Sequence, residues 1–193
     1  QVFELPTFEQ VGEWHHNQTP MNQQIRILQG INKHIYDTIM EQDASASPQI
    51  FYSMENNTIG EAALLRVMDI GEENIQGMFL SEPIRKGHRR KFRRGFNTTA
   101  KFKIDACTKF KELVEGGKMK INSQLLISEL KDFVASGLSF KAKPGQHDDL
   151  VSACLLMTRM MKVLADFDPK IFEKWTDRTS ELTPMPIFGS FTG

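Results

Sequence analysis

The sequence has only two cysteines, no excess of either charge and no long apolar run. Cys107 and Cys154 both lie in helical apolar patterns, which indicates reduced, buried thiols and not a disulfide framework. The 24 basic and 24 acidic residues cancel, so any affinity for nucleic acid must come from local clusters. The chain shows no signal peptide and no segment able to span a bilayer, and we expect no membrane partner.

Internal repeats, low-complexity segments and the phosphate-binding pattern G-x-x-x-x-G-K-[ST] are also absent, so we expect no ATP hydrolysis. The chain has 193 residues, 40% of them hydrophobic, which is enough for one ordinary core. We expect a single domain over residues 1–168, followed by a short helix and a flexible tail over 169–193. The first residues, 1–5, resemble the middle of a strand, and we expect the chain to be a domain of a larger protein.

Hydrophobic periodicity predicts alternating strands and helices. The expected strands are 2–5 and 10–16, joined as a hairpin, then 50–54, 77–80, 119–121 and 138–143. Helices are expected from Thr19-Pro20 to near Asp43, over 59–68, from Thr98-Thr99 to Gly116-Gly117, from Ser123 through Phe133 and Val134, from Asp148 through Leu164, and over 171–175. This order predicts a mixed α/β sheet with helices on both faces, whose active crevice lies beyond the carboxyl ends of the strands.

Three carboxylates stand at such positions. Glu55 closes the apolar run 50–54, and Asp148 and Asp149 begin a long apolar helix. Each alone has an ordinary explanation, as a loop residue or a helix cap. Adjacent carboxylates repel each other and capping uses only one, so the pair favours a bound cation. Mg²⁺ and Mn²⁺ prefer such oxygen ligands, and we give His147 and Asn56 supporting roles beside them.

A basic segment carries seven Lys and Arg residues within ten positions, with Phe92 among them. They are Arg85, Lys86, Arg89, Arg90, Lys91, Arg93 and Arg94. Such a run is often only a solvated surface or a localisation signal. Its place between two core elements favours contact with DNA phosphates. Thr99 and Lys101, at the next helix start, are further candidates, although N-capping is the commoner use of a threonine there.

Four segments together carry a resemblance to a known family. They are Tyr52 to Gly60, Gly95 to Lys101, Leu113 to Ile121 and His147 to Val151. In this order they resemble the nuclease domain of tailed-bacteriophage terminase large subunits, most closely the T4-type branch, and they span nearly the whole chain.

The resemblance implies a ribonuclease H-like fold and two-metal cleavage of concatemeric double-stranded DNA, with two Mg²⁺ or Mn²⁺ ions. Glu55 would be the second catalytic acid, and the third position would be the Asp148-Asp149 pair, with Asp148 the principal ligand. The implied partners are the terminase ATPase domain, the portal and the small terminase subunit, in the host cytoplasm during phage assembly.

The family's first catalytic aspartate has no counterpart in this sequence, and we expect the sheet to lack its first strand. We therefore expect weak binding of Mg²⁺ and little cleavage by the 193-residue chain. Two alternatives stay open: a junction-resolvase-like nuclease of the same fold, and a DNA-binding or docking module without catalysis.

Overall fold

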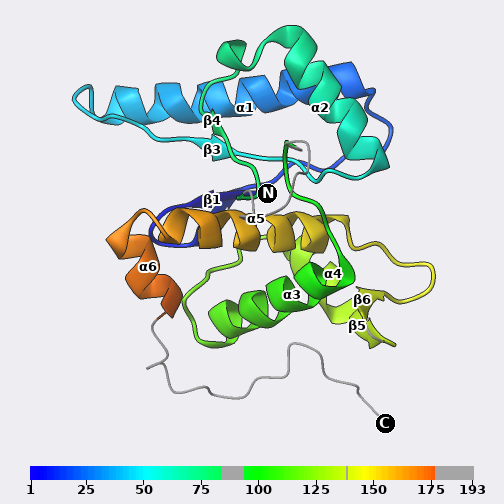
Figure 1. Cartoon of the computed structure of the whole chain (residues 1–193). Helices are drawn as coiled ribbons and strands as arrows, with labels where there is room; N and C mark the ends of the chain where they lie inside the picture. Colours follow the sequence, from blue (N-terminus) through cyan, green and yellow to red (C-terminus); the bar gives the residue numbers. More distant parts are fainter. Residues whose placement is uncertain (84–93, 138, 177–193) are drawn as a thin grey trace. The chain divides into compact units, whose positions relative to one another are not determined.

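A computed structural model describes residues 1–83, 94–137 and 139–176 (Figure 1). The chain forms two compact units. Unit 1 consists of Gln1–His15 together with the chain from Thr99 onward, and unit 2 is His16–Thr98. Across the described ranges, the helices are α1 to α6, and none of them is long and apolar enough to cross a bilayer.

Unit 2 is built on two helices and one pair of parallel strands. The helices are α1 (Met21–Gln42) and α2 (Thr58–Ile70), followed by the short 3-10 helix η1 (Glu72–Asn74). Strand β3 (Phe51–Tyr52) pairs in parallel with β4 (Met78–Phe79), so α2 is the crossover between them. The core comprises the buried residues Ile25, Tyr52, Ala63, Val67 and Ile75.

Unit 1 begins with an antiparallel hairpin, as the sequence predicts. Strand β1 (Val2–Glu4) pairs with β2 (Glu9–Gly12). The buried side chain of Gln10 ties this hairpin to a distant segment, because its Oε1 accepts hydrogen bonds from the backbone N–H groups of Asn122, at 2.9 Å, and Ser123, at 3.0 Å. A parallel bridge between Glu9 and Lys120 lies beside these bonds.

The rest of unit 1 is organised around helix α5 (Asp149–Ala165), which packs against α3 (Ala100–Glu115), α4 (Gln124–Asp132) and α6 (Pro169–Thr176) (Figure 1). Val151, Cys154 and Met161 of this helix are almost completely buried. The antiparallel strands β5 (Phe133–Ser136) and β6 (Ser139–Ala142) complete the unit.

Several predicted elements are confirmed, and three details are wrong. The predicted helices coincide with α1 to α6 within a few residues, and Thr99 and Ser123 cap α3 and α4 by accepting from Phe102 N and Leu126 N. Phe133 and Val134 are not helical, because α4 ends at Asp132 and pairing with β6 holds them extended.

The other differences concern a cap, a strand and the sheet. The pair Thr19-Pro20 predicts a threonine cap with proline at the first helical position, but Pro20 is the N-cap of α1 and makes no side-chain cap bond. The expected strand 119–121 is reduced to the single bridge at Lys120. The strands of the described ranges form three two-stranded ladders, and the single mixed sheet stays a prediction. The architecture is therefore mixed α/β, with six helices and small sheets in the described part of the chain.

Candidate functional site

The N-terminus of α5 carries the predicted Asp148-Asp149 pair. Asp148 is the N-cap residue and Asp149 is the first helical residue. Capping is the ordinary use of an acidic residue at a helix start. Asp148, however, makes no side-chain cap bond. Its backbone carbonyl accepts the first helical bond, from Ser152 N at 2.8 Å, and its carboxylate points elsewhere.

The cap is supplied by Glu129 from helix α4. Its Oε2 accepts hydrogen bonds from Leu150 N, at 2.8 Å, and from Val151 N, at 3.1 Å. These are two of the N–H groups that a helix start leaves without a partner. The pKa of Glu129 lies above its usual value. Partial burial is the largest cause and the charge of Asp149 adds to it, while the hydrogen bonds from the two N–H groups oppose it. A third carboxylate thus lies at this helix start, and it leaves both aspartate side chains free of capping.

Each aspartate faces a nitrogen that is or can become cationic. Lys103 Nζ lies 3.6 Å from Asp148 Oδ2, and the same ammonium lies 5.4 Å from the centre of the Phe133 ring. His15 Nε2 lies 3.7 Å from Asp149 Oδ2. These pairs are partly exposed, so each contributes roughly 0–1 kcal/mol to stability. Their arrangement indicates where positive charge is favourable around the two carboxylates.

Glu55 lies in unit 2, where the chain passes from β3 into α2. It forms a parallel bridge with Phe96, and its Oε2 accepts a hydrogen bond from Asn57 Nδ2 at 3.0 Å. The same amide group of Asn57 caps α2, because its Oδ1 accepts from Gly60 N at 2.7 Å. Gly60 in turn lies against Glu55: a Cβ atom on Gly60 would stand 1.6 Å from the carbonyl oxygen of Glu55. Glu55 is therefore held at both its backbone and its carboxylate.

Asn56, predicted to support the metal ligands, is a buried structural residue. Its backbone N donates to Phe96 O at 2.7 Å, and its Nδ2 donates to Arg94 O at 2.9 Å. The Oδ1 atom is buried and has no hydrogen-bond partner in the described residues. Asn56 thus fixes the strand end next to Glu55. His147 is exposed immediately before Asp148.

The basic segment falls mostly outside the described residues, which include only Arg94 of its seven Lys and Arg positions. Arg85, Lys86, Arg89, Arg90, Lys91 and Arg93 lie within the omitted range 84–93. Arg94 forms an ion pair with Glu72 and stands 5.9 Å from the centre of the Phe79 ring. Its guanidinium is therefore already engaged within unit 2. Thr99 uses its hydroxyl to cap α3, and Lys101 is exposed on the first turn of that helix.

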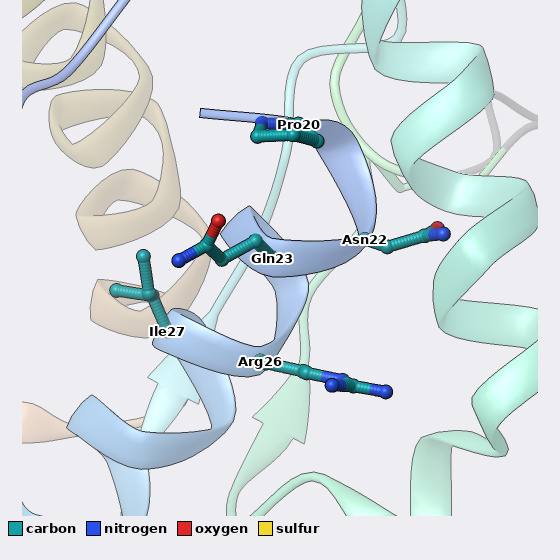
Figure 2. A pocket seen from close by; sticks show the side chains of 5 residues that line it. All are labelled: Pro20, Asn22, Gln23, Arg26 and Ile27. Carbon is teal, nitrogen blue, oxygen red and sulfur yellow. The ribbon is translucent and has the colours of Figure 1, made fainter. Parts of the chain in front are cut away.

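A depression of about 560 Å³ lies at the start of α1 and is shown in Figure 2. Its lining residues are Pro20, Asn22, Gln23, Arg26 and Ile27. Gln23 and Ile27 point to one side of the helix, and Asn22 and Arg26 point to the other, toward α2 (Figure 2). The lining holds no carboxylate or imidazole, so it lacks the charged oxygen ligands through which Mg²⁺ and Mn²⁺ are usually bound. None of the predicted acids belongs to it.

The oxygen donors at α5 suit Mg²⁺ or Mn²⁺ in kind but not in number. Among residues 1–83, 94–137 and 139–176, no group of three or more His, Cys, Asp or Glu side chains is arranged to hold a metal ion. The Asp148-Asp149 pair would supply two ligands, and a complete site needs more. No family model matches this chain.

Three residues of the α5 site were not predicted: Glu129, Lys103 and His15. Sequence spacing carries no signal for Glu129, because 20 residues separate it from Asp149 and the α4–α5 packing that joins them is tertiary. Lys103 lies on the face of α3 that turns toward α5, so the amphipathic pattern of α3 is the one signal that could have indicated it.

Proposed function

We propose that this chain is the nuclease part of a phage DNA-packaging terminase, a metal-dependent endonuclease of ribonuclease H-like fold that cuts concatemeric double-stranded DNA. One observation carries the proposal: both aspartates at the start of α5 are released from capping by Glu129 and face positively charged or protonatable side chains. The order of the four resembling segments supports it as well.

In this proposal Asp148, Asp149 and Glu55 hold Mg²⁺ or Mn²⁺, two ions in all. When bound, such ions polarise the phosphodiester and lower the pKa of the attacking water. The chain's own residues perform the other tasks. Lys103, placed beside Asp148, orients that carboxylate. The basic residues of 85–94, with Lys101, bind the DNA backbone.

The proposed partners are double-stranded DNA, the terminase ATPase domain, the portal and the small terminase subunit, in the cytoplasm of the infected host. A ribonuclease H-like fold would require the three ladders to belong to one larger sheet that also contains a further strand. The proposed assignment of Glu55 and of the aspartate pair rests on the local geometry of each unit separately.

The first test measures Mn²⁺ binding by calorimetry and, in parallel, cleavage of linear duplex DNA and of four-way junctions. Asp148→Ala and Glu55→Ala should each weaken Mn²⁺ binding about tenfold or more, because even residues that only orient metal ligands contribute 10–100-fold. The matched controls are Asp132→Ala in unit 1 and Asp69→Ala in unit 2, which remove exposed or partly exposed carboxylates paired with Lys143 and Arg66. The controls should bind Mn²⁺ like the unaltered chain.

The result that refutes the assignment is Mn²⁺ binding that survives both Asp148→Ala and Glu55→Ala. Cleavage of junctions in preference to linear duplex would favour the resolvase-like nuclease.

A second candidate function is a DNA-binding or docking module without catalysis. The specific observation in its favour is that no three-ligand metal group exists among the described residues. Weak metal binding and little cleavage are already expected of this chain as a nuclease. The deciding result is therefore duplex binding with no Mn²⁺ binding at any concentration tested, which would establish this candidate in place of the nuclease.

A further inference from the structure

A second depression adjoins the one shown in Figure 2, on the side of α1 toward which Asn22 and Arg26 point. It has a volume of about 370 Å³ and lies between α1 and α2 of unit 2. Asn22 and Arg26 line both depressions, so the two meet at these side chains. We call the second depression the α1–α2 groove; its lining residues are Asn22, Arg26, Gln29, Arg66, Asp69 and Ile70.

The guanidinium of Arg26 is the group in this groove that the fold leaves unengaged. Arg26 is exposed, and it is the only charged residue in the range 21–32 of α1. The other Lys and Arg residues that the structure describes in unit 2 all form ion pairs: Lys33 with Asp37, Arg66 with Asp69 and Arg94 with Glu72. No carboxylate of the described ranges pairs with Arg26. Its N–H donors are therefore available to a ligand.

The rest of the lining suits an anion. Asp69 is its one carboxylate, and Asp69 Oδ2 already accepts a hydrogen bond from Arg66 Nη1 at 3.0 Å. Two guanidinium groups against one carboxylate leave the lining with a net positive charge. Asn22 adds an exposed amide on the same side of α1 as Arg26 (Figure 2). A planar guanidinium matches the oxygens of a phosphate, and asparagine amides often contact phosphates as well.

We propose that the α1–α2 groove binds a phosphate group of the DNA backbone. Arg26 is the principal ligand, Asn22 is a second donor, and Asp69 limits the site by engaging Arg66. One guanidinium and one amide, both exposed, hold a free phosphate only weakly in water. A duplex instead adds this contact to those made elsewhere on the same chain, so a weak contact still raises the overall affinity. The inference rests on the proposed function only for DNA as the source of the phosphate, and it needs no metal ion.

The experiment measures binding of a short fluorescent duplex by anisotropy, in EDTA and over about 50–200 mM salt. Arg26→Ala is compared with Lys33→Ala, which removes the same charge from the same helix outside the groove. Asp69→Asn, which releases Arg66, is compared with Asp37→Asn, which releases Lys33 in the same way. Inorganic phosphate is titrated into each chain by calorimetry, and circular dichroism establishes that each variant is folded.

Arg26→Ala should lower the slope of log K against log salt by ~0.9, which is the loss of one phosphate contact, and weaken binding about eightfold near 0.1 M salt. Asp69→Asn should raise the slope by up to ~0.9, because Arg66 then becomes available to a phosphate. Lys33→Ala and Asp37→Asn should each leave the slope within ~0.3 of the unaltered chain. A gain in Asp69→Asn cannot arise from unfolding, so it separates the groove from a loss of structure.

An unchanged slope in either Arg26→Ala or Asp69→Asn would overturn the inference, and so would an unaltered chain that binds no duplex. Equal losses in Arg26→Ala and Lys33→Ala would overturn it as well, because net charge and not the groove would then be the cause. Binding of inorganic phosphate that depends on Arg26, without any effect on duplex, would show that DNA is the wrong source. Since every measurement is made in EDTA, failure of the proposed metal site leaves these results unchanged, and failure of the groove leaves the Mn²⁺ tests unchanged.

Discussion

Gly60 offers a sharp test of how Glu55 is held, because the structure leaves no room for a side chain there. A Cβ atom at this position would lie 1.6 Å from Glu55 O and 2.8 Å from the carbonyl carbon of the same residue. Real Cβ atoms essentially never come within 3.0 Å of another heavy atom, so the substitution Gly60→Ala must separate α2 from Glu55 by more than an ångström. The obstructing atoms are backbone and cannot rotate away.

Two opposing effects set the size of the change. Replacing glycine by alanine inside a helix ordinarily stabilises the folded state by about 0.5–1 kcal/mol. Forcing extra volume into a tight contact costs typically 1–3 kcal/mol and sometimes more. Since the clash involves backbone, we expect the cost to prevail and Gly60→Ala to lower the free energy of unfolding by about 2 kcal/mol. The same displacement would move Glu55 away from Asn57 Nδ2, with which it forms a hydrogen bond.

Gly30 is the matched control. It lies within α1 of the same unit, and a Cβ atom there would meet no heavy atom within 4 Å. Gly30→Ala should therefore raise the free energy of unfolding by about 0.5–1 kcal/mol. Urea denaturation followed by circular dichroism measures both variants. If Gly60→Ala is as stable as Gly30→Ala, the close approach of α2 to Glu55 is wrong.

Two further predictions concern unit 1. Gln10→Ala removes the acceptor of two backbone N–H groups, those of Asn122 and Ser123. It should lower the free energy of unfolding by roughly 2–6 kcal/mol in urea denaturation, at about 1–3 kcal/mol for each orphaned donor. A loss below about 0.5 kcal/mol, the range of an ordinary surface change, would show that water replaces the glutamine. Burial raises the pKa of Cys107 to about 11 and that of Cys154 to about 12, from 9.0, so both thiols should resist a thiol reagent at pH 8 until the protein unfolds. Unfolded thiols ionise near pH 9, whereas the folded ones stay neutral to higher pH. The stability that the buried thiols contribute is therefore fully present below pH 9 and is lost as the pH rises toward 11 and 12. Unfolding midpoints that stay constant over this range would contradict the burial.

The helices were predictable because their signals are local. Apolar residues recur at helical spacing in all six, and capping residues such as Thr99 and Ser123 act within three positions of themselves. The extended conformation of Phe133 and Val134 could not be predicted from local signals, since an apolar pair fits a helix and a strand equally well. Pairing with β6 decided between the two.

The same distinction between local and long-range signals applies to the candidate site. The position of Asp148 and Asp149 at a helix start could be read from the sequence, and so could the position of Glu55 after a strand. What each carboxylate contacts could not. The partners Lys103, His15 and Glu129 come from α3, from the chain after the hairpin and from α4, and only tertiary packing brings them to α5. The arrangement of the strands into one sheet or three ladders is likewise a long-range property.

The tie between Gln10 and Ser123 has a consequence for the order in which the protein forms during synthesis. Its two ends are 113 positions apart, and all of unit 2 is translated between them. A two-stranded hairpin is marginally stable alone, so β1 and β2 gain their lasting partner only after the ribosome has released residues 120–123. At ~5–20 residues per second that delay is roughly 6–23 s. Unit 2 is contiguous and can fold within this interval. Unit 1 therefore completes its folding later, although it contains Gln1–His15.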